Sequence, residues 1–131
     1  MFSTLTPLDW KRRAVKYYPQ KTAVIDEEKQ FTYKEFADRT DRLSVALHEA
    51  GIRKGDHVVV MLPNTHYMLE SFYGICQLGA TMVPLNYRLK AEDLEYIINH
   101  SDAKMLIVDE EFSGPIEEIV DNLALEEIVV V

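Results

Sequence analysis

Short, nearly continuous apolar runs recur from residue 57 to the end of the chain. They occupy residues 57–62 (HVVVML), 81–85 (TMVPL), 104–109 (KMLIVD) and 127–131 (EIVVV). All four are rich in β-branched residues, and continuous rather than alternating apolarity is typical of strands buried on both faces. The pattern therefore predicts four buried strands of a parallel sheet.

The segments between these runs have helical periodicity and helix boundary signals. They are 65–78, which follows Asn64 and ends at Gly79, then 91–100, and then 115–124, which begins with Pro115. The apolar positions that share a face are Leu94, Ile97 and Ile98 in the second segment and Ile116, Ile119, Val120 and Leu123 in the third. Strands that alternate with helices through short connections indicate βαβ units. The fold class is therefore α/β, with a mostly parallel sheet, helices on both faces and one domain over residues 1–131.

A longer helix is predicted from Thr32 to Ala50. Thr32 and Glu35 have the spacing of a capping box, in which each side chain bonds the other residue's backbone N–H. Gly51 can adopt the left-handed conformation that ends a helix, with Ile52 packing back onto it. The apolar face is expected to hold Phe36, Leu43, Leu47 and Ala50, with Thr40 between them.

The first thirty residues predict a helix and a hairpin. Residues 7–18 are amphipathic and are followed by Pro19, which cannot continue a helix. Residues 22–25 and 30–33 then flank a polar turn at 26–29. We expect a helix lying on the domain, followed by a small β-hairpin.

Composition is that of a globular protein with a strong acidic balance. Of 131 residues, 47% are hydrophobic and 27% charged, and the net charge is −8. Such a charge disfavours nucleic acid and anionic membranes as partners in the absence of a local basic stripe. The densest basic cluster, Lys11-Arg12-Arg13, is interpreted as the solvated face of the helix over 7–18.

The cysteine count and the start of the chain indicate a cytoplasmic protein. A single cysteine, Cys76, excludes an internal disulfide and fits a reducing compartment. Because Cys76 lies in an apolar run, we expect a packed thiol rather than a nucleophile. The first residues lack the apolar core of a secretion signal, and no run of 18 apolar residues occurs. In a cytoplasmic chain, the glycosylation pattern at Asn99–Ser101 has no meaning.

The carboxyl ends of the predicted strands, where doubly wound sheets bind ligands, carry no recognisable phosphate loop. They are followed by residues 63–65 (PNT), 86–89 (NYRL) and 110–115 (EEFSGP). The five glycines fit neither of the two glycine-rich nucleotide patterns, which need glycine for close approach of the backbone. No cofactor-binding residue is therefore assigned.

Catalytic and metal-ligating patterns are also missing. The four histidines are not spaced as ligand pairs, Cys76 has no partner, and neither Ser71 nor Ser113 has a histidine beside it in the sequence. The acidic run Asp109-Glu110-Glu111 could hold a hard cation, but a solvated loop is the preferred interpretation. The remaining aromatic residues are interpreted as core or as a wall against a neighbouring subdomain; they are Tyr17, Tyr18, Tyr67, Phe72 and Tyr73. We therefore assign no catalytic and no metal residue.

Four segments resemble the adenylate-forming acyl-CoA synthetases. They are FTYKEF (31–36), GIRKGDHVVVMLPN (51–64), GICQLGATMVPLNYRL (74–89) and AEDLEYIINHSDAKMLIVDEEF (91–112). The resemblance keeps their order and spacing and covers nearly the whole chain. Within that superfamily, PLNYRL is more similar to the fatty-acid CoA ligases than to peptide-synthetase domains, which usually have an Asp in this segment.

The resemblance implies an intact enzyme that joins a carboxylic acid to CoA. Such an enzyme uses ATP and Mg²⁺ to form an acyl-adenylate and then exchanges AMP for CoA, giving a thioester. Family members run to several hundred residues, and their phosphate loop, ribose-binding Asp and adenylation Lys have no counterpart here. Arginines that meet CoA in some acetyl-CoA ligases fall where this chain has its acidic loop at Asp109. The resemblance thus implies a truncated N-terminal subdomain that is an inactive scaffold, binds none of these cofactors alone and leaves an interior strand exposed at 127–131.

Two alternatives stay open at this point. A receiver-like or flavodoxin-like binding domain would share the size and the parallel sheet, although the first strand of this sheet lacks the acidic pair that a receiver needs. An interaction module that uses its last strand as an open edge is the other alternative, and it predicts self-association.

Overall fold

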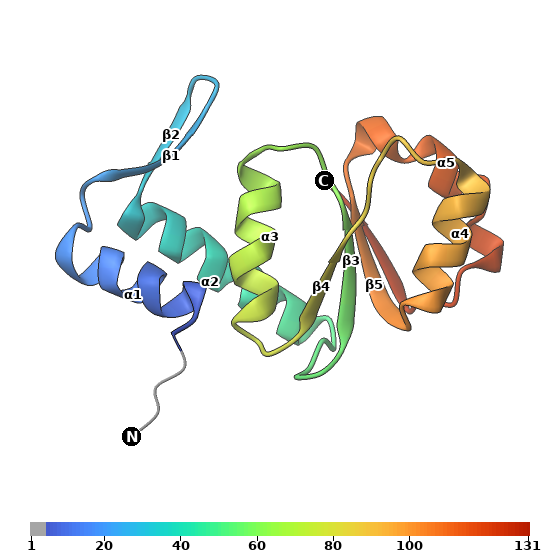
Figure 1. Ribbon diagram of the computed structural model, residues 1–131, viewed down its shortest axis with the longest axis horizontal. Helices are drawn as coiled ribbons and strands as arrows, with labels where there is room; N and C mark the ends of the chain where they lie inside the picture. Colours follow the sequence, from blue (N-terminus) through green and yellow to red (C-terminus); the bar gives the residue numbers. More distant parts are fainter. Residues whose placement is uncertain (1–4) are drawn as a thin grey trace.

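The computed structural model describes residues 5–131 and divides into an N-terminal part and a parallel sheet with its helices (Figure 1). In the N-terminal part, two helices pack beside a hairpin. Its elements are α1 (Pro7–Tyr17), β1 (Thr22–Asp26), β2 (Lys29–Thr32) and α2 (Tyr33–Glu49). The predicted helix and hairpin are confirmed, except that Asp26 and Lys29 pair within the strands and Tyr33 opens α2.

The predicted parallel sheet is confirmed. Its strands lie in the order β4-β3-β5-β6, and each neighbouring pair is parallel. Their bounds are β3 (His57–Met61), β4 (Thr81–Pro84), β5 (Ala103–Val108) and β6 (Glu127–Val130). Each lies within one residue of its predicted limits. The carboxyl ends of all four strands therefore meet at one edge of the sheet.

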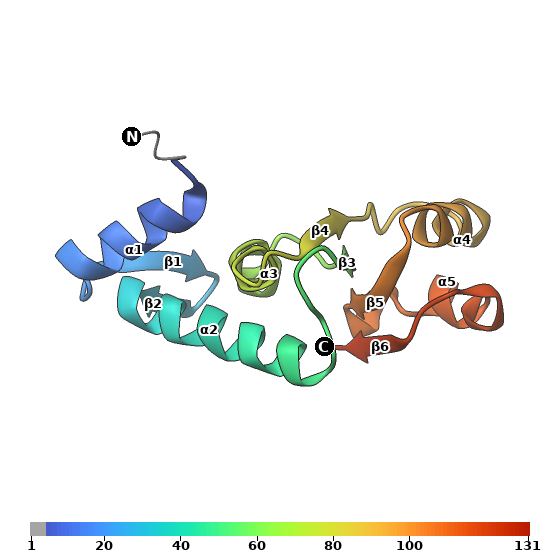
Figure 2. The ribbon, with the colours of Figure 1, turned by 90° about the horizontal axis from the view of Figure 1, so that it is seen from below.

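Helices cover both faces of this sheet, as predicted (Figure 2). On one face, Val58 and Val60 pack with residues of α2 and of α3 (His66–Cys76). On the other, Val59 and Met61 pack with α4 (Ala91–His100) and α5 (Gly114–Glu117). Successive strand residues point to opposite faces, so a strand inside such a sheet must be apolar at every position.

Both ends of α2 are built as the sequence predicts. The Thr32 hydroxyl accepts the N–H of Glu35 at 3.2 Å, and the Glu35 carboxylate accepts the N–H of Thr32 at 2.8 Å. At the other end Gly51 has φ +95°, and the N–H of Ile52 donates to the carbonyl of Leu47 at 2.9 Å. These are a capping box and a Schellman motif.

The predicted buried face of α2 is correct at its centre and wrong at its end. Phe36, Thr40 and Leu47 are buried, but Ala50 is exposed because it is the C-cap residue, where the chain turns away from the sheet. Ser44, which was not predicted to be inside, is buried because its hydroxyl donates to the carbonyl of Gly74 on α3.

The edge position of β4 follows from Pro84. Pro84 is the last residue of β4 and pairs with Val60. Proline has no N–H to donate to a further strand, so it is found at sheet edges or where pairing ends. Both conditions hold here, as the sequence indicated.

The single helix predicted over 115–124 is wrong. Only one turn, α5, forms, and a 3₁₀ turn follows at Val120–Asn122. The helix is interrupted at Ile119, whose φ of −117° and ψ of 0° are not helical. Further along, the side-chain amide of Asn99 on α4 donates to the carbonyl of Asn122 at 3.0 Å, and its carbonyl oxygen accepts the N–H of Ala124 at 2.9 Å, so tertiary bonds hold the segment that ends the 3₁₀ turn. Val120 is left exposed.

Over residues 5–131, no helix combines the length and the apolarity needed to cross a membrane.

Candidate functional site

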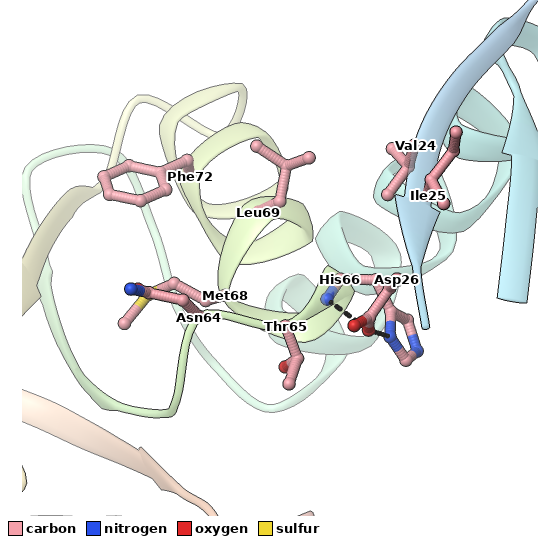
Figure 3. A pocket seen from close by; sticks show the side chains of 9 residues that line it. All are labelled: Val24, Ile25, Asp26, Asn64, Thr65, His66, Met68, Leu69 and Phe72. Carbon is pink, nitrogen blue, oxygen red and sulfur yellow. Dashed lines mark hydrogen bonds and ion pairs between the residues drawn. The ribbon is translucent and has the colours of Figure 1, made fainter. Parts of the chain in front are cut away.

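A pocket lies between the hairpin and the start of α3, beside the carboxyl end of β3 (Figure 3). This is the edge where ligands bind in open α/β sheets. The pocket has a volume of about 280 Å³, and we call it the hairpin pocket. Its lining residues are Val24, Ile25, Asp26, Asn64, Thr65, His66, Met68, Leu69 and Phe72. One end is polar and the other apolar.

The polar end is dominated by a contact between Asp26 of β1 and His66 of α3. One oxygen of the Asp26 carboxylate accepts the backbone N–H of His66 at 2.9 Å and lies 2.5 Å from Nδ1 of the same residue. The two side chains face each other in Figure 3, and His66 is only 4% exposed. A carboxylate and an imidazole 40 residues apart thus join the hairpin to α3.

The bonds to His66 keep the Asp26 carboxylate ionised. The backbone hydrogen bond and then the side-chain hydrogen bond of His66 hold the pKa of Asp26 below its ordinary value, against the opposing effect of burial. A carboxylate that accepts two such bonds is stabilised in its charged form.

Asp26 also bonds a free N–H at the start of α3. Thr65 is the N-cap residue of α3, one of the two positions that the sequence indicated, but its hydroxyl makes no capping bond and is buried without a partner among residues 5–131. The N–H of His66, the first residue of the helix, is bonded by Asp26. One of the unpaired donors of this helix end is therefore satisfied from another element.

Aromatic rings hold the imidazole in place. The ring of His66 lies 5.3 Å from that of Phe31 on β2 and 4.0 Å from that of Tyr67. The guanidinium of Arg39 lies 4.8 Å from the Phe31 ring and forms an ion pair with Glu70, a buried residue of α3. The ion pair and its hydrogen bonds raise the pKa of Arg39. The charged groups around the pocket are therefore paired with one another.

An apolar groove adjoins the hairpin pocket. It has a volume of about 500 Å³ and lies between the start of α1 and the outer face of α3. Its lining residues are Thr6, Pro7, Leu8, Leu69, Phe72, Tyr73 and Cys76. Leu69 and Phe72 line both cavities, so the apolar end of the hairpin pocket continues into this groove.

The predictions for Cys76 and the aromatic residues need correction. Cys76 is exposed, not packed, because its side of α3 faces the groove rather than the sheet. Tyr17, Tyr18, Tyr67 and Phe72 are likewise exposed, so they do not belong to the core of residues 5–131. Their role as a wall stays a prediction.

The prediction for Lys11 is also wrong, because its side chain is only 8% exposed. Its ammonium group donates to the Thr40 hydroxyl at 2.7 Å, to the Gln77 carbonyl oxygen at 2.8 Å and to Asp41 at 3.2 Å. Gln77 in turn donates to the Ser44 hydroxyl at 2.5 Å. A lysine of α1 is thus enclosed by polar groups of α2 and α3, whereas Arg12 and Arg13 are exposed as expected.

The acidic run after β5 lies largely in solvent, and its carboxylates bond locally. Asp109 accepts the N–H of Glu111 at 3.0 Å, and Glu110 and Glu111 are exposed. Within the part of the chain that the structure describes, no three His, Cys, Asp or Glu side chains are placed to hold a metal.

The residues that follow the carboxyl ends of β3 and β5 are not suited to binding the triphosphate of a nucleotide. The first N–H of α3, which could bind a phosphate, already bonds the charged carboxylate of Asp26. The next loop along the sheet edge carries Asp109, Glu110 and Glu111, which repel phosphate. We therefore derive no step that involves ATP, Mg²⁺ or CoA at these residues.

The hydrogen-bonded contact between Asp26 and His66 could not be predicted from the sequence. The sequence pattern places Asp26 in the turn and leaves His66 an isolated histidine. Each residue is unremarkable in its own segment, and only the packing of the hairpin on α3 brings them together. The lack of a capping bond from Thr65 shows only in the structure.

Residues 11–131 match a family described as "AMP-binding enzyme". The 4-hydroxybutyrate–CoA ligase 2 of Metallosphaera sedula is 38% identical over 125 residues, which are 95% of this chain and 23% of that protein. The chain spans between a fifth and a quarter of the length of the curated relatives it matches.

Solved structures of CoA ligases are also similar to this chain. The anthranilate–CoA ligase AuaEII in complex with anthranoyl-AMP superposes with a TM-score of 0.91 and is 34% identical, over 95% of this chain and 24% of that one. A long-chain-fatty-acid–CoA ligase, FadD1, of Archaeoglobus fulgidus superposes with a TM-score of 0.91 at 27% identity, over 100% of this chain and 28% of that one.

Proposed function

We propose a ligase function from one premise: the chain belongs to the AMP-binding enzyme family. The proposed reaction joins a carboxylic acid to CoA at the expense of ATP. The carboxylate attacks the α-phosphorus of Mg-ATP, which gives an acyl-adenylate and releases pyrophosphate. The CoA thiol then attacks the acyl carbon, loses its proton and displaces AMP, which leaves a thioester. The match over residues 11–131 is the observation that carries this proposal.

The proposed substrate is a fatty acid, and the product its CoA thioester. Two features support it: the PLNYRL segment at 84–89 and the similarity to the FadD1 fatty-acid ligase. The relatives named for 4-hydroxybutyrate and anthranilate make short hydroxy acids and aromatic acids the competing substrate classes.

Within that enzyme, the proposed role of residues 1–131 is that of a scaffold subdomain. The charged groups of the hairpin pocket are bonded to each other, and the loop after β5 is acidic. Charge clamps on the phosphates, which such a reaction needs, would then come from other polypeptide. The receiver-like and flavodoxin-like alternatives lose their support, because the family match accounts for the same sheet.

The substrate proposal is tested with the protein expressed from its complete reading frame. Release of AMP and formation of thioester are measured with ATP, CoA and one acid from a panel of decanoate, butyrate, 4-hydroxybutyrate, benzoate and anthranilate. We expect the highest kcat/KM with decanoate. A preference for an aromatic or a hydroxy acid contradicts the fatty-acid proposal, and no AMP release with any acid contradicts the ligase proposal.

The scaffold proposal is tested by calorimetry on the 131-residue chain alone. Titration with Mg-ATP in the presence of decanoate should give no binding heat, and incubation with CoA should give no thioester. Binding of ATP in the micromolar range, or any turnover, contradicts the scaffold role without affecting the ligase proposal.

A further inference from the structure

We propose that α1 and the turn after it form a docking face for an anionic lipid surface. We call it the basic aromatic face. Its members are Trp10, Arg12, Arg13, Lys16, Tyr17, Tyr18 and Lys21. The inference does not depend on the proposed function, because it concerns where the protein lies rather than what it converts.

The first observation is a separation of charge along the chain. Residues 10–21 contain five basic residues and no acidic one. The net charge of −8 is therefore the balance of +5 in this segment and −13 in the rest of the chain. Lys11 is buried and paired with Asp41, so the other four form the local basic stripe without which the acidic composition would disfavour an anionic partner.

The second observation is that Arg13 and exposed aromatic rings share one side of α1. Trp10, Tyr17 and Tyr18 are 64%, 60% and 56% exposed. Together with Arg13, Ala14 and Tyr33 they line a shallow hollow of about 370 Å³. Tyrosine and tryptophan combine an apolar ring with a polar group and are enriched at the level of lipid headgroups.

The third observation is that most of these cations are free to meet an anion. Arg12 pairs with Asp9 at 2.9 Å, but Arg13, Lys16 and Lys21 form no ion pair with residues 5–131. Lys16 and Lys21 lie over the rings of Tyr17 and Tyr18, at 5.4 Å and 5.1 Å from the ring centres. These contacts keep the ammonium groups at the surface beside the aromatic rings.

The opposite side of α1 is fixed, so the face is preformed. Lys11 is bonded to α2 and α3 through Thr40, Asp41 and Gln77. The helix lies at the end of the molecule remote from α4 and α5 (Figures 1 and 2). A membrane that meets this end stays away from much of the acidic surface, and salt weakens repulsion over longer distances.

A lipid surface fits these features better than a nucleic acid. An extended polyanion that follows α1 would run on to a body of charge −13, whereas a planar surface can touch the end alone. Each exposed Lys or Arg near an anionic surface lowers the dissociation constant about fivefold. Binding should therefore be peripheral, dependent on anionic lipid and sensitive to salt.

Trp10 is the only tryptophan and provides the readout. Vesicles of phosphatidylcholine with 30% phosphatidylglycerol are added to the 131-residue chain at low ionic strength. We expect a blue shift of the Trp10 emission, quenching by brominated lipid, and co-sedimentation that is lost at high salt. Pure phosphatidylcholine vesicles should give none of these.

Charge-neutral variants test whether binding depends on the basic aromatic face or only on the net charge of the protein. The triple substitution Arg13→Gln, Lys16→Gln and Lys21→Gln should weaken binding to anionic vesicles about a hundredfold. The matched triple substitution Arg42→Gln, Lys54→Gln and Lys90→Gln removes the same charge from exposed positions elsewhere and should change binding little. Tyr17→Ala with Tyr18→Ala should reduce the quenching by brominated lipid. Circular dichroism checks that each variant is folded.

Four outcomes would overturn the proposal. They are an unchanged Trp10 emission with anionic vesicles, equal losses in the two triple variants, tighter binding to single-stranded DNA or polyglutamate than to vesicles, and no co-sedimentation of the protein expressed from its complete reading frame. The third would assign the face to an acidic macromolecule, and the fourth would mean that other polypeptide covers it.

Discussion

Single polar residues join the N-terminal part of this protein to its sheet. Asp26 bonds the first N–H and the imidazole of His66, and Lys11 bonds polar groups of α2 and α3. Asp26 satisfies the N–H of His66, and the largely buried ammonium group of Lys11 is held by three acceptors. An unpaired buried polar group costs more than a typical hydrogen bond contributes. Substituting either residue should therefore weaken the contact between the N-terminal part and the sheet without creating a cavity in the hydrophobic core.

Asp26→Asn should lower the melting temperature at neutral pH, and the loss should shrink in acid. Because the pKa of Asp26 is below its ordinary value of 3.8, the stabilisation by the carboxylate is complete above that value and is lost as the pH falls through the lower, folded-state pKa. Thermal unfolding of both proteins between pH 7 and pH 2 measures the difference.

Asp38→Asn is the matched control, because Asp38 is exposed and makes no side-chain hydrogen bond with residues 5–131. A loss from Asp26→Asn that is the same at every pH, or that is no larger than that of the control, would contradict the role of the ionised carboxylate.

Lys11→Met should lower the free energy of unfolding by about 1–3 kcal/mol, since it leaves three acceptors on α2 and α3 without their charged donor. Urea unfolding measures this loss, and hydrogen exchange should show faster exchange confined to α1. Lys16→Met removes an exposed lysine of the same helix and should change stability by less than about 0.5 kcal/mol. Equal effects of the two substitutions would mean that the buried network does not anchor α1.

Among the helices, α2 and α3 approach each other closely where α3 has a glycine, Gly74. A Cβ added at Gly74 would lie 2.7 Å from Cδ2 and 3.2 Å from Cβ of Leu43 on α2. The carbonyl of Gly74 also accepts the Ser44 hydroxyl at 2.6 Å. Glycine is needed here for space rather than for an unusual φ, because helices that approach this closely leave no room for a side chain.

Gly74→Ala should therefore destabilise the protein by about 1–3 kcal/mol, as overpacking does in a filled core. A rotation of the Leu43 side chain can relieve the contact with Cδ2, but the contact with Cβ stays tight unless the helices shift. Gly114→Ala is the control: nothing lies within 4 Å of the added methyl group, and stability should stay within about 1 kcal/mol or rise slightly. Urea unfolding that ranks the two substitutions equally would contradict a tight contact at Gly74.

At the scale of the whole molecule, the two edges of the sheet differ. The edge at β4 ends on Pro84, which has no N–H to offer. The edge at β6 has β5 on one side and no strand on the other within residues 5–131, and Val130 is 54% exposed there. An open edge with apolar side chains is a template for pairing with another chain.

We predict that the 131-residue chain self-associates through β6. Light scattering should give a mean mass that rises with concentration, and Val130→Lys should return it to that of the monomer because edge lysines oppose strand pairing. Tyr96→Lys replaces an exposed aromatic residue on α4 and should have no effect. A mass that stays monomeric at all concentrations, or that falls equally in both variants, would contradict an edge contact.

Elements that depend on neighbouring residues could be predicted from the amino-acid sequence. The capping box at Thr32, the Schellman motif at Gly51 and the continuous apolar runs of the strands are local or nearly local, so hydrogen bonding and burial act on them directly. The family could also be recognised from the sequence, because the matching segments, their order and the spacing between them are read directly along the chain.

Features that depend on contacts between distant segments became visible only in the folded protein. Asn99 bonds the segment after the 3₁₀ turn at 120–122, Asp26 bonds the first N–H of α3, and Lys11 turns inward although its segment is basic and polar. A side chain takes whichever partner best satisfies its polar atoms once the chain has packed. When that partner lies 40 residues away, as His66 does from Asp26, no pattern along the sequence shows it.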